Sequence, residues 1–289
     1  MVTITSKDGT RIAYSRSGSG PPLVLVHGTT ADRTRWARLI PELEPHFTVY
    51  ALDRRGRGGS GDAVEYAIER EFEDVAAVID AIGEPAFLLG HSYGAICSLE
   101  ASILTGKVRR LVLYEPPIPI DGPVYPPGVP ERIQALVDAG DPEAALEVFF
   151  REVVRMPDRE FEVYRTLPTW KVRITLAPTI PRELTIERSY RFQPERFAQF
   201  SIPTLLLLGG DSPPVFRQAI DMVNAALLTS RIVVLPGQQH VAMDTAPELF
   251  LKEVIGFLSG QAATTGAAAA RVSIADPPDG QPSDPRTRI

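Results

Sequence analysis

A serine between two glycines is the clearest chemical signal in this chain. The segment Gly90-His91-Ser92-Tyr93-Gly94 follows the apolar run Phe87-Leu88-Leu89 and precedes a segment of helical period. A sharp strand-to-helix turn of this kind lifts the serine hydroxyl clear of the sheet edge, at the positive end of the helix. The two glycines remove the Cβ atoms that would collide in the turn. Ser92 is therefore the candidate nucleophile.

A serine hydroxyl needs an imidazole to accept its proton. Of the four histidines, His27 and His91 belong to turns beside glycine or serine, and His46 precedes a strand on the far side of the sheet. His240 lies in the loop after the last apolar run and before the final helix. We therefore predict that His240 is the general base.

The imidazole in turn needs a carboxylate to orient it. Asp211 follows the apolar run Leu205 to Leu208, at the C-terminal end of the strand before the one that leads to His240. Two rivals exist: Glu115, at the end of the preceding parallel strand, and Asp244, which is close in sequence to His240. The sequence favours Asp211 as the catalytic acid.

Acyl transfer also needs hydrogen-bond donors for the developing oxyanion, worth roughly 3 kcal/mol each. Two backbone amides suit this role. The amide of Tyr93 follows the nucleophile at a helix N-terminus, and the turn after the first parallel strand offers the amide of Thr29. We expect these two groups to form the oxyanion hole.

These residues must be positioned by a sheet, and the chain contains the strands to build one. It opens with a hairpin, since Asp8-Gly9 separates two short alternating runs. Continuous apolar runs follow, which are typical of strands buried on both faces of a parallel sheet. They are Leu23 to Val26, Phe47 to Leu52, Phe87 to Leu89, Val108 to Tyr114, Leu205 to Leu208 and Ile232 to Leu235.

Helical segments alternate with these strands, which predicts an α/β fold with helices on both faces of a mostly parallel sheet. The alternation of strands and helices stops over residues 116–199, where several helical stretches separated by proline indicate an inserted helical cap. The expected helices there are Glu131 to Asp138, Pro142 to Val154, Arg159 to Leu167 and Arg182 to Tyr190. We expect residues 1–115 and 200–260 to form the core domain. Residues 261–289, rich in alanine and proline, are expected to be a disordered tail.

With these pieces in place, residues 1–260 resemble the α/β-hydrolase fold family, in the branch with a helical cap after the sixth strand. The resemblance depends on His27-Gly28, Trp36, Asp53 to Ser60, the serine turn, Asp211 and His240. The family places nucleophile, acid and base in this chain order. Members with this appearance include esterases, lactonases, carbon–carbon hydrolases and cofactor-free haloperoxidases. Epoxide hydrolases and haloalkane dehalogenases usually have Asp in place of Ser92, which argues against both.

Aromatic residues of the cap are the candidates for a substrate pocket, although such residues at helical spacing are more often core than pocket wall. The candidates are Trp36 in the core domain and, in the cap, Tyr125, Phe149, Phe150, Tyr164 and Trp170. The cap has eleven Lys/Arg residues against thirteen Asp/Glu residues, so its arginines are expected to be neutralised by carboxylates. An anionic substrate is therefore not implied.

One glycine-rich segment imitates a dinucleotide-binding motif. Gly56 to Gly61 matches Gly-x-Gly-x-x-Gly after a strand. However, three charged residues precede it, and helical periodicity is clear only from about Glu69. We therefore expect a structural turn and no nicotinamide or flavin cofactor.

Composition limits the partners. Thirty basic against thirty-six acidic residues give a net charge of −6, without the basic excess of a nucleic-acid-binding protein. The lone Cys97 cannot form an internal disulfide, and the chain has neither a Cys/His cluster for a metal nor an 18-residue apolar run for a membrane span. We expect a cytoplasmic protein that needs no cofactor or metal and acts on a small molecule. The sequence leaves its oligomeric state open.

The main hypothesis is a serine hydrolase that cleaves a carboxylic ester or lactone through an acyl-enzyme. A second hypothesis is a small-molecule receptor that keeps the fold and the triad but turns over little. A third is a cofactor-free carbon–carbon hydrolase or haloperoxidase-like enzyme. Cleavage of short p-nitrophenyl esters by the wild type but not by Ser92→Ala distinguishes the first from the second.

Overall fold

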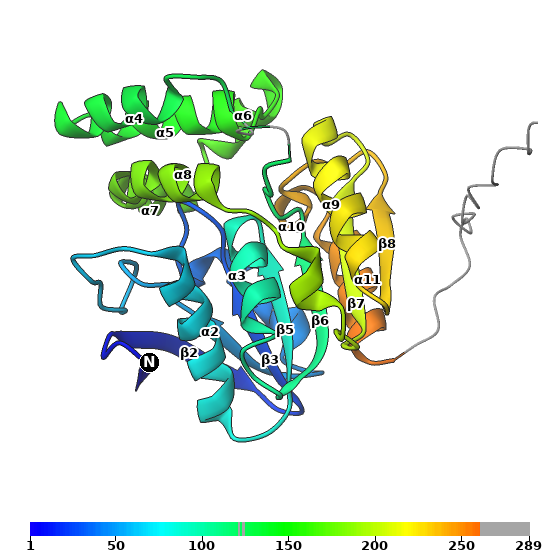
Figure 1. Cartoon of the computed structure of the whole chain (residues 1–289). Coiled ribbons are helices and arrows are strands. Elements are labelled where there is room, and N and C mark those ends of the chain that lie inside the picture. The colour runs from blue at the N-terminus through cyan, green and yellow to red at the C-terminus, as the bar shows by residue number, and fades with distance from the viewer. Residues whose placement is uncertain (121, 123–124, 261–289) are drawn as a thin grey trace, which may run out of the picture.

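The computed structural model describes residues 1–120, 122 and 125–260, and the tail predicted at 261–289 lies outside them. One eight-stranded sheet forms its centre (Figure 1), in the order β1-β2-β4-β3-β5-β6-β7-β8. Only the pairs β1–β2 and β2–β4 are antiparallel. The strands are β1 (Val2–Thr5), β2 (Arg11–Gly18), β3 (Pro22–Val26), β4 (Thr48–Leu52), β5 (Ala86–His91), β6 (Val108–Tyr114), β7 (Thr204–Gly209) and β8 (Ser230–Leu235). The predicted mostly parallel sheet is confirmed.

Two apolar layers cover the faces of the sheet, as the alternation of side chains along each strand requires. Along β3, Val24 and Val26 belong to one layer, which also contains apolar residues of α2 (Ile68–Ile82), α3 (Tyr93–Ala101) and α9 (Pro214–Ala226). Leu23 and Leu25 belong to the other, with residues of η1 (Arg33–Trp36), α1 (Ile40–Leu43) and α11 (Pro247–Leu258). The sheet is thus a rigid, doubly covered platform for the loops at its edge.

The segment Thr245-Ala246-Pro247-Glu248 matches a Ser/Thr-x-x-Glu capping box, which predicts Thr245 as the N-terminal cap of the last helix. The N-terminal cap is Ala246, and a separate short helix, α10 (Ala242–Thr245), precedes it. The Thr245 hydroxyl instead donates to Gln238 Oε1 at 2.6 Å. The prediction was wrong by one residue because Thr245 is used by the loop that carries His240.

Between β6 and β7 the chain forms helices that lie over the carboxyl ends of the strands (Figure 1), and we call them the overlying helices. They are α4 (Val129–Asp138), α5 (Pro142–Val148), the π-helical turn η2 (Phe149–Val153), α6 (Asp158–Tyr164), α7 (Thr169–Leu176), η3 (Ala177–Thr179) and α8 (Ile180–Ser189). A short 3₁₀ helix, η4 (Pro194–Phe197), leads back to β7. Four expected helices occur with shifted ends, whereas α7 had not been predicted.

Buried ion pairs connect the overlying helices to the sheet. Arg57 Nη2 lies 2.6 Å from Glu183 Oε1 of α8, and Arg54 contacts the same carboxylate while its Nε lies 2.6 Å from Glu71 Oε2 of α2. All four side chains are buried. Since removing one partner leaves an uncompensated buried charge, these pairs hold α8 in a defined position above the sheet.

Across residues 1–120, 122 and 125–260, no helix combines the length and apolar character needed to cross a membrane.

Candidate active site

Ser92 occupies a strained turn between β5 and α3. Its φ of 56° and ψ of −128° lie in a region that non-glycine residues rarely adopt. A Cβ on Gly90 would lie 2.4 Å from the Gly94 carbonyl oxygen, and one on Gly94 would lie 2.4 Å from the His27 oxygen. Both glycines are therefore required for this turn to pack against β3. The backbone amide of Ser92 donates to the Tyr114 carbonyl at 2.9 Å, which fixes the turn to β6.

His240 lies in the loop after β8, and aromatic rings hold it on two sides. Phe216 stacks on its imidazole at a centroid distance of 4.7 Å, and the ring of His91 lies at the same distance. His91 Nε2 donates to the His240 carbonyl at 2.9 Å, and Tyr114 Oη accepts from the Ala242 amide at 3.1 Å. The loop therefore presents His240 in one defined position.

The carboxylate on His240 comes from Glu115, directly after β6. Its Oε2 lies 2.7 Å from His240 Nδ1, while Oε1 accepts hydrogen bonds from the Gly209 amide and the Ser212 hydroxyl, both at 2.6 Å. Glu115 is fully buried and has a positive φ of 46°, which turns its side chain toward the histidine loop. One oxygen of Glu115 therefore contacts the imidazole, and the other is held by the end of β7 and the turn that follows it.

The structure corrects the prediction that Asp211 contacts His240. Asp211 is exposed in the turn after β7, where its backbone amide donates to the Gln238 carbonyl at 2.9 Å. Strand β7 ends at Gly209, two residues before Asp211, whereas Glu115 directly follows β6, which lies next to β5, the strand that leads to Ser92. The second rival, Asp244, forms an ion pair with Arg35 instead.

The turn expected to supply an oxyanion donor packs tightly on the serine. A Cβ on Gly28 would lie 2.8 Å from Ser92 Cβ and 3.1 Å from the His91 oxygen, so only glycine allows this approach. Thr29 follows it and lines the same pocket as Ser92. Tyr93 is the first residue of α3. Both amides are thus close to the nucleophile in the fold, while their role in stabilising an oxyanion stays a prediction.

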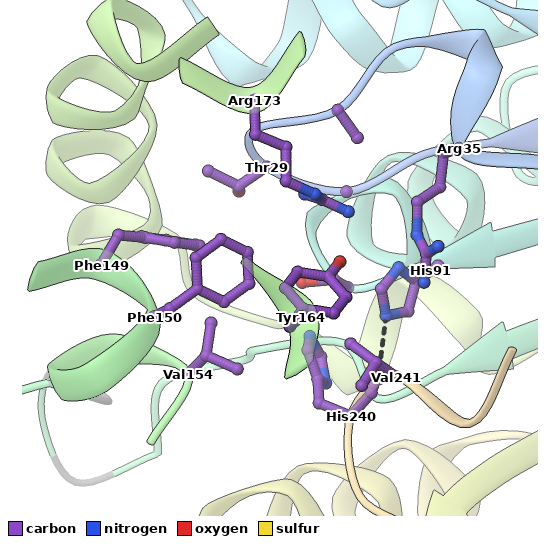
Figure 2. Close-up of a pocket in the computed structure, with 13 residues that line it drawn as sticks. Thr29, Arg35, His91, Phe149, Phe150, Val154, Tyr164, Arg173, His240 and Val241 are labelled. Carbon is purple, nitrogen blue, oxygen red and sulfur yellow. Dashed lines mark hydrogen bonds between the residues drawn. The ribbon is translucent and has the colours of Figure 1, made fainter. Parts of the chain in front are cut away.

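The pocket above Ser92 contains about 330 Å³ of atom-free space, part of it open to solvent. Figure 2 shows the overlying helices supplying one wall and the loops of Thr29 and His240 supplying the other. The lining residues are Gly28, Thr29, Ala31, Arg35, His91, Ser92, Phe149, Phe150, Val154, Tyr164, Arg173, His240 and Val241.

Of the six residues predicted to contact the substrate, Phe149, Phe150 and Tyr164 line this pocket and three do not. Trp36 is fully buried in the layer beneath the sheet. Tyr125 packs among the overlying helices and donates its hydroxyl to the Leu184 carbonyl at 2.5 Å, and Trp170 Nε1 donates to Glu143 at 2.9 Å. These three residues are packing residues, as the helical spacing of aromatic residues generally implies.

Sequence reasoning missed both arginines of the pocket. Arg35 precedes Trp36 in η1, and Arg173 lies on α7. No motif surrounds either residue, and the chain has many arginines, so only the folded arrangement distinguishes these two.

The other buried histidines of this region stay neutral. Burial and the nearby Arg54 charge hold the pKa of His27 well below its usual range, and burial does the same for the pKa of His91. His27 Nε2 accepts from the Arg54 amide at 3.1 Å. His27 and His91 therefore act as hydrogen-bonding parts of the scaffold.

The glycine-rich segment Gly56 to Gly61 forms a closed turn, as predicted. The Gly59 amide donates to Asp53 Oδ2 at 2.8 Å, and a Cβ on Gly58 would lie 2.2 Å from that same oxygen. Helix α2 begins only at Ile68, so no helix N-terminus faces the glycines. This arrangement lacks the geometry of a dinucleotide-binding loop.

A doubly covered, mostly parallel sheet with a strained serine after one strand and a histidine after the last defines an α/β-hydrolase fold. The chain belongs to the Alpha/beta hydrolase family, whose sequence profile matches residues 23–253. This membership makes the chain a member of a hydrolase family, and the family alone does not specify which bond is cleaved.

Individual relatives agree with this placement. The crystal structure of an alpha/beta hydrolase from Sphaerobacter thermophilus is 39% identical, with a TM-score of 0.78, and the match covers 89% of this chain and 100% of that one. An esterase, RhEst1, from a Rhodococcus species is 25% identical with a TM-score of 0.75, covering 90% and 99%. A 2-(acetamidomethylene)succinate hydrolase from Mesorhizobium japonicum is 24% identical over 263 residues, 83% of this chain and 89% of that protein.

Proposed function

We propose that this protein is a serine hydrolase that cleaves a carboxylic ester or lactone of a small molecule through an acyl-enzyme. One observation carries the proposal: Ser92 and His240 line a single pocket, and the buried Glu115 carboxylate lies 2.7 Å from His240 Nδ1. A serine, an imidazole and a carboxylate in this relation form a general base and nucleophile unit.

In the first half of the reaction, Ser92 Oγ attacks the substrate carbonyl carbon while His240 Nε2 accepts the hydroxyl proton. Glu115 accepts the hydrogen bond from Nδ1–H and stabilises the imidazolium that forms. The carbonyl oxygen gains negative charge within reach of the amides of Thr29 and Tyr93. Collapse of the tetrahedral intermediate breaks the bond to the alcohol, which leaves with the proton from His240.

In the second half, water replaces the alcohol. His240 Nε2 accepts a proton from water, whose oxygen attacks the acyl carbon, and collapse releases the carboxylic acid and returns the proton to Ser92 Oγ. In a lactone the alcohol remains tethered to the acyl group, so one product carries both groups. The proposal therefore needs no cofactor in any step.

The test is steady-state hydrolysis of p-nitrophenyl acetate and butyrate. Wild type is expected to turn both over, and Ser92→Ala is expected to reduce kcat by about 10⁴-fold or more. Ser102→Ala is the matched control, because Ser102 is another buried serine, whose hydroxyl donates to the Leu99 carbonyl. Equal rates for wild type and Ser92→Ala would contradict the proposal.

A further inference from the structure

Arg173 places a positive charge in the wall of the pocket that contains Ser92 and His240. It comes from α7, and the whole residue is only 5% exposed. Figure 2 shows its guanidinium group extending from the overlying helices into the pocket. Nothing in the proposed acyl-transfer chemistry uses this charge.

The contacts of Arg173 are neutral. Its Nη1 donates to the carbonyl and hydroxyl oxygens of Thr30, at 3.1 and 2.7 Å. Its Cζ lies 5.4 Å from the ring centre of Phe150 and 5.2 Å from that of Tyr164. The buried Nε has no hydrogen-bond partner. Among residues 1–120, 122 and 125–260, no carboxylate oxygen lies within 4.0 Å of this guanidinium group.

Arg35 shows what a neutralised arginine looks like in the same pocket. Its two terminal nitrogens lie 2.8 and 2.7 Å from the two carboxylate oxygens of Asp244. The sequence-based expectation that carboxylates neutralise the arginines of residues 116–199 is therefore wrong for Arg173. After burial and the Tyr164 phenol, the positive charge of Arg35 lowers the pKa of Arg173, while the charges of Asp244 and Asp32 raise it without a hydrogen bond to the guanidinium group.

A buried charge of this kind is costly unless a partner is present. Burial lowers the pKa of Arg173, yet a guanidinium group stays protonated in proteins. Two neutral oxygens and two aromatic rings offset only part of the lost hydration. A ligand anion would provide the missing compensation, and the pocket is where a ligand binds.

We propose that Arg173 binds a carboxylate group of the substrate, so that the ester or lactone carries a negative charge apart from the bond that is cleaved. Thr30 occupies Nη1, which leaves the edge formed by Nε and Nη2. This edge of a guanidinium group presents two parallel N–H donors that match the two oxygens of a carboxylate. The statement that this anion is an ester or lactone substrate rests on the proposed function. The binding of a carboxylate by Arg173 does not depend on it.

Binding to the inactive Ser92→Ala protein tests the inference without turnover. The probes are the monoethyl esters of malonate, succinate, glutarate and adipate, each compared by calorimetry with its neutral diethyl ester. We expect at least one monoethyl ester to bind about ten-fold or more tightly than its diester. Equal affinity throughout the series, or binding of neither kind, would overturn the inference.

Two further variants, made in the same inactive protein, test whether Arg173 causes the preference for the charged monoethyl esters. Arg173→Gln is expected to abolish it, and Lys171→Gln, an exposed residue on the same helix, is expected to retain it. A preference that survives Arg173→Gln would also overturn the inference. If Arg173→Gln does not fold, the comparison of charged and neutral esters in Ser92→Ala still decides.

The two proposals fail separately. A preference for the charged esters, combined with ester hydrolysis that does not depend on Ser92, would refute the acyl-enzyme and leave the anion site. Hydrolysis that depends on Ser92, without any preference for charge, would refute the anion site alone.

Discussion

Glu115 Oε2 lies 2.7 Å from His240 Nδ1, and the two residues come from the ends of different strands, 125 positions apart in the chain. The remaining oxygen of Glu115 accepts two hydrogen bonds, from the Gly209 amide and the Ser212 hydroxyl. A carboxylate held in this way fixes the Nδ1–H tautomer of the imidazole and leaves Nε2 free to accept a proton.

Glu115→Gln is expected to lower kcat by about 10³- to 10⁴-fold, as the equivalent change does in chymotrypsin-type triads. The amide that replaces one oxygen can donate to Nδ1, which stabilises the wrong tautomer. Steady-state kinetics with p-nitrophenyl butyrate, together with a thermal unfolding curve to show that the variant folds, would measure this.

Asp211→Asn provides the matched comparison, because Asp211 is exposed at the end of the next strand. We expect its kcat to stay within about three-fold of wild type, since surface changes away from the site have small effects. If Asp211→Asn lost activity and Glu115→Gln retained it, the carboxylate assignment would have to be reversed.

The close approach of Gly28 to the nucleophile predicts a second effect. In Gly28→Ala the new Cβ would lie 2.8 Å from Ser92 Cβ, so the turn that carries Thr29 must move away. Displacing a catalytic group by about 1 Å costs on the order of 10²-fold in rate. We expect kcat to fall by that amount. Gly106→Ala is the control, because its Cβ would meet nothing within 4 Å, and equal losses in both variants would refute the steric explanation.

Substitution of a pocket residue is expected to change KM, whereas substitution of a packing residue is expected to change stability. Val154 lines the pocket, so Val154→Phe should raise KM for p-nitrophenyl butyrate by about ten-fold or more. Trp170 packs on Phe161 and outside the pocket, so Trp170→Phe should lower stability by about 1–2 kcal/mol with KM nearly unchanged. Measuring KM and the unfolding midpoint of both variants checks this, and the opposite pattern would restore Trp170 as a substrate contact.

A buried acid on α8 predicts how stability depends on pH. Burial raises the pKa of Glu187 well above its usual range, and the charge of Glu183 adds to the shift. The folded protein therefore keeps this proton at pH values at which the unfolded chain has released it. The contribution of Glu187 to the free energy of unfolding is fully present below the pKa of this group in the unfolded chain. It decreases as the pH rises toward its pKa in the folded protein.

The neutral amide of Glu187→Gln should remove this loss. We expect wild type and variant to unfold at the same temperature near pH 4, and the variant to unfold about 2 °C or more higher at pH 8. Differential scanning calorimetry at both values measures the difference. Glu248→Gln, an exposed residue of α11, should change little at either pH. A variant that is less stable than wild type at pH 8 would be inconsistent with the argument.

The sequence predicted the sheet well because each buried strand is a continuous apolar run. The boundaries of β6, Val108–Tyr114, were predicted to the residue, and Ser92 stands where Gly-x-Ser-x-Gly placed it. These features are local: the strand, the turn and the helix are all encoded within a few neighbouring residues.

What the sequence could not decide was which strand end reaches His240. Glu115 and Asp211 each follow a buried strand, and their order along the chain is compatible with either role. The choice depends on the lateral position of β6 and β7 in the sheet and on the positive φ of Glu115. Neither property is visible in a local pattern.

Helix α7 was missed for a different reason, and Arg173 was missed with it. Its sequence, Thr-Trp-Lys-Val-Arg-Ile-Thr-Leu, alternates polar and apolar residues and lacks the stripe of an amphipathic helix. The helix forms because Trp170, Arg173 and Leu176 are buried on one side, and Arg173 is the polar member of that set. A buried arginine breaks the pattern that would have revealed the helix.

Trapping the acyl-enzyme is the most direct measurement of the central claim. Wild-type protein is mixed with p-nitrophenyl acetate, quenched with acid within milliseconds and analysed by mass spectrometry of its peptides. We expect an acetyl group on the peptide that contains Ser92, present in wild type and absent from Ser92→Ala. Ester turnover by wild type with no acetyl group on that peptide, and undiminished turnover by Ser92→Ala, would contradict it.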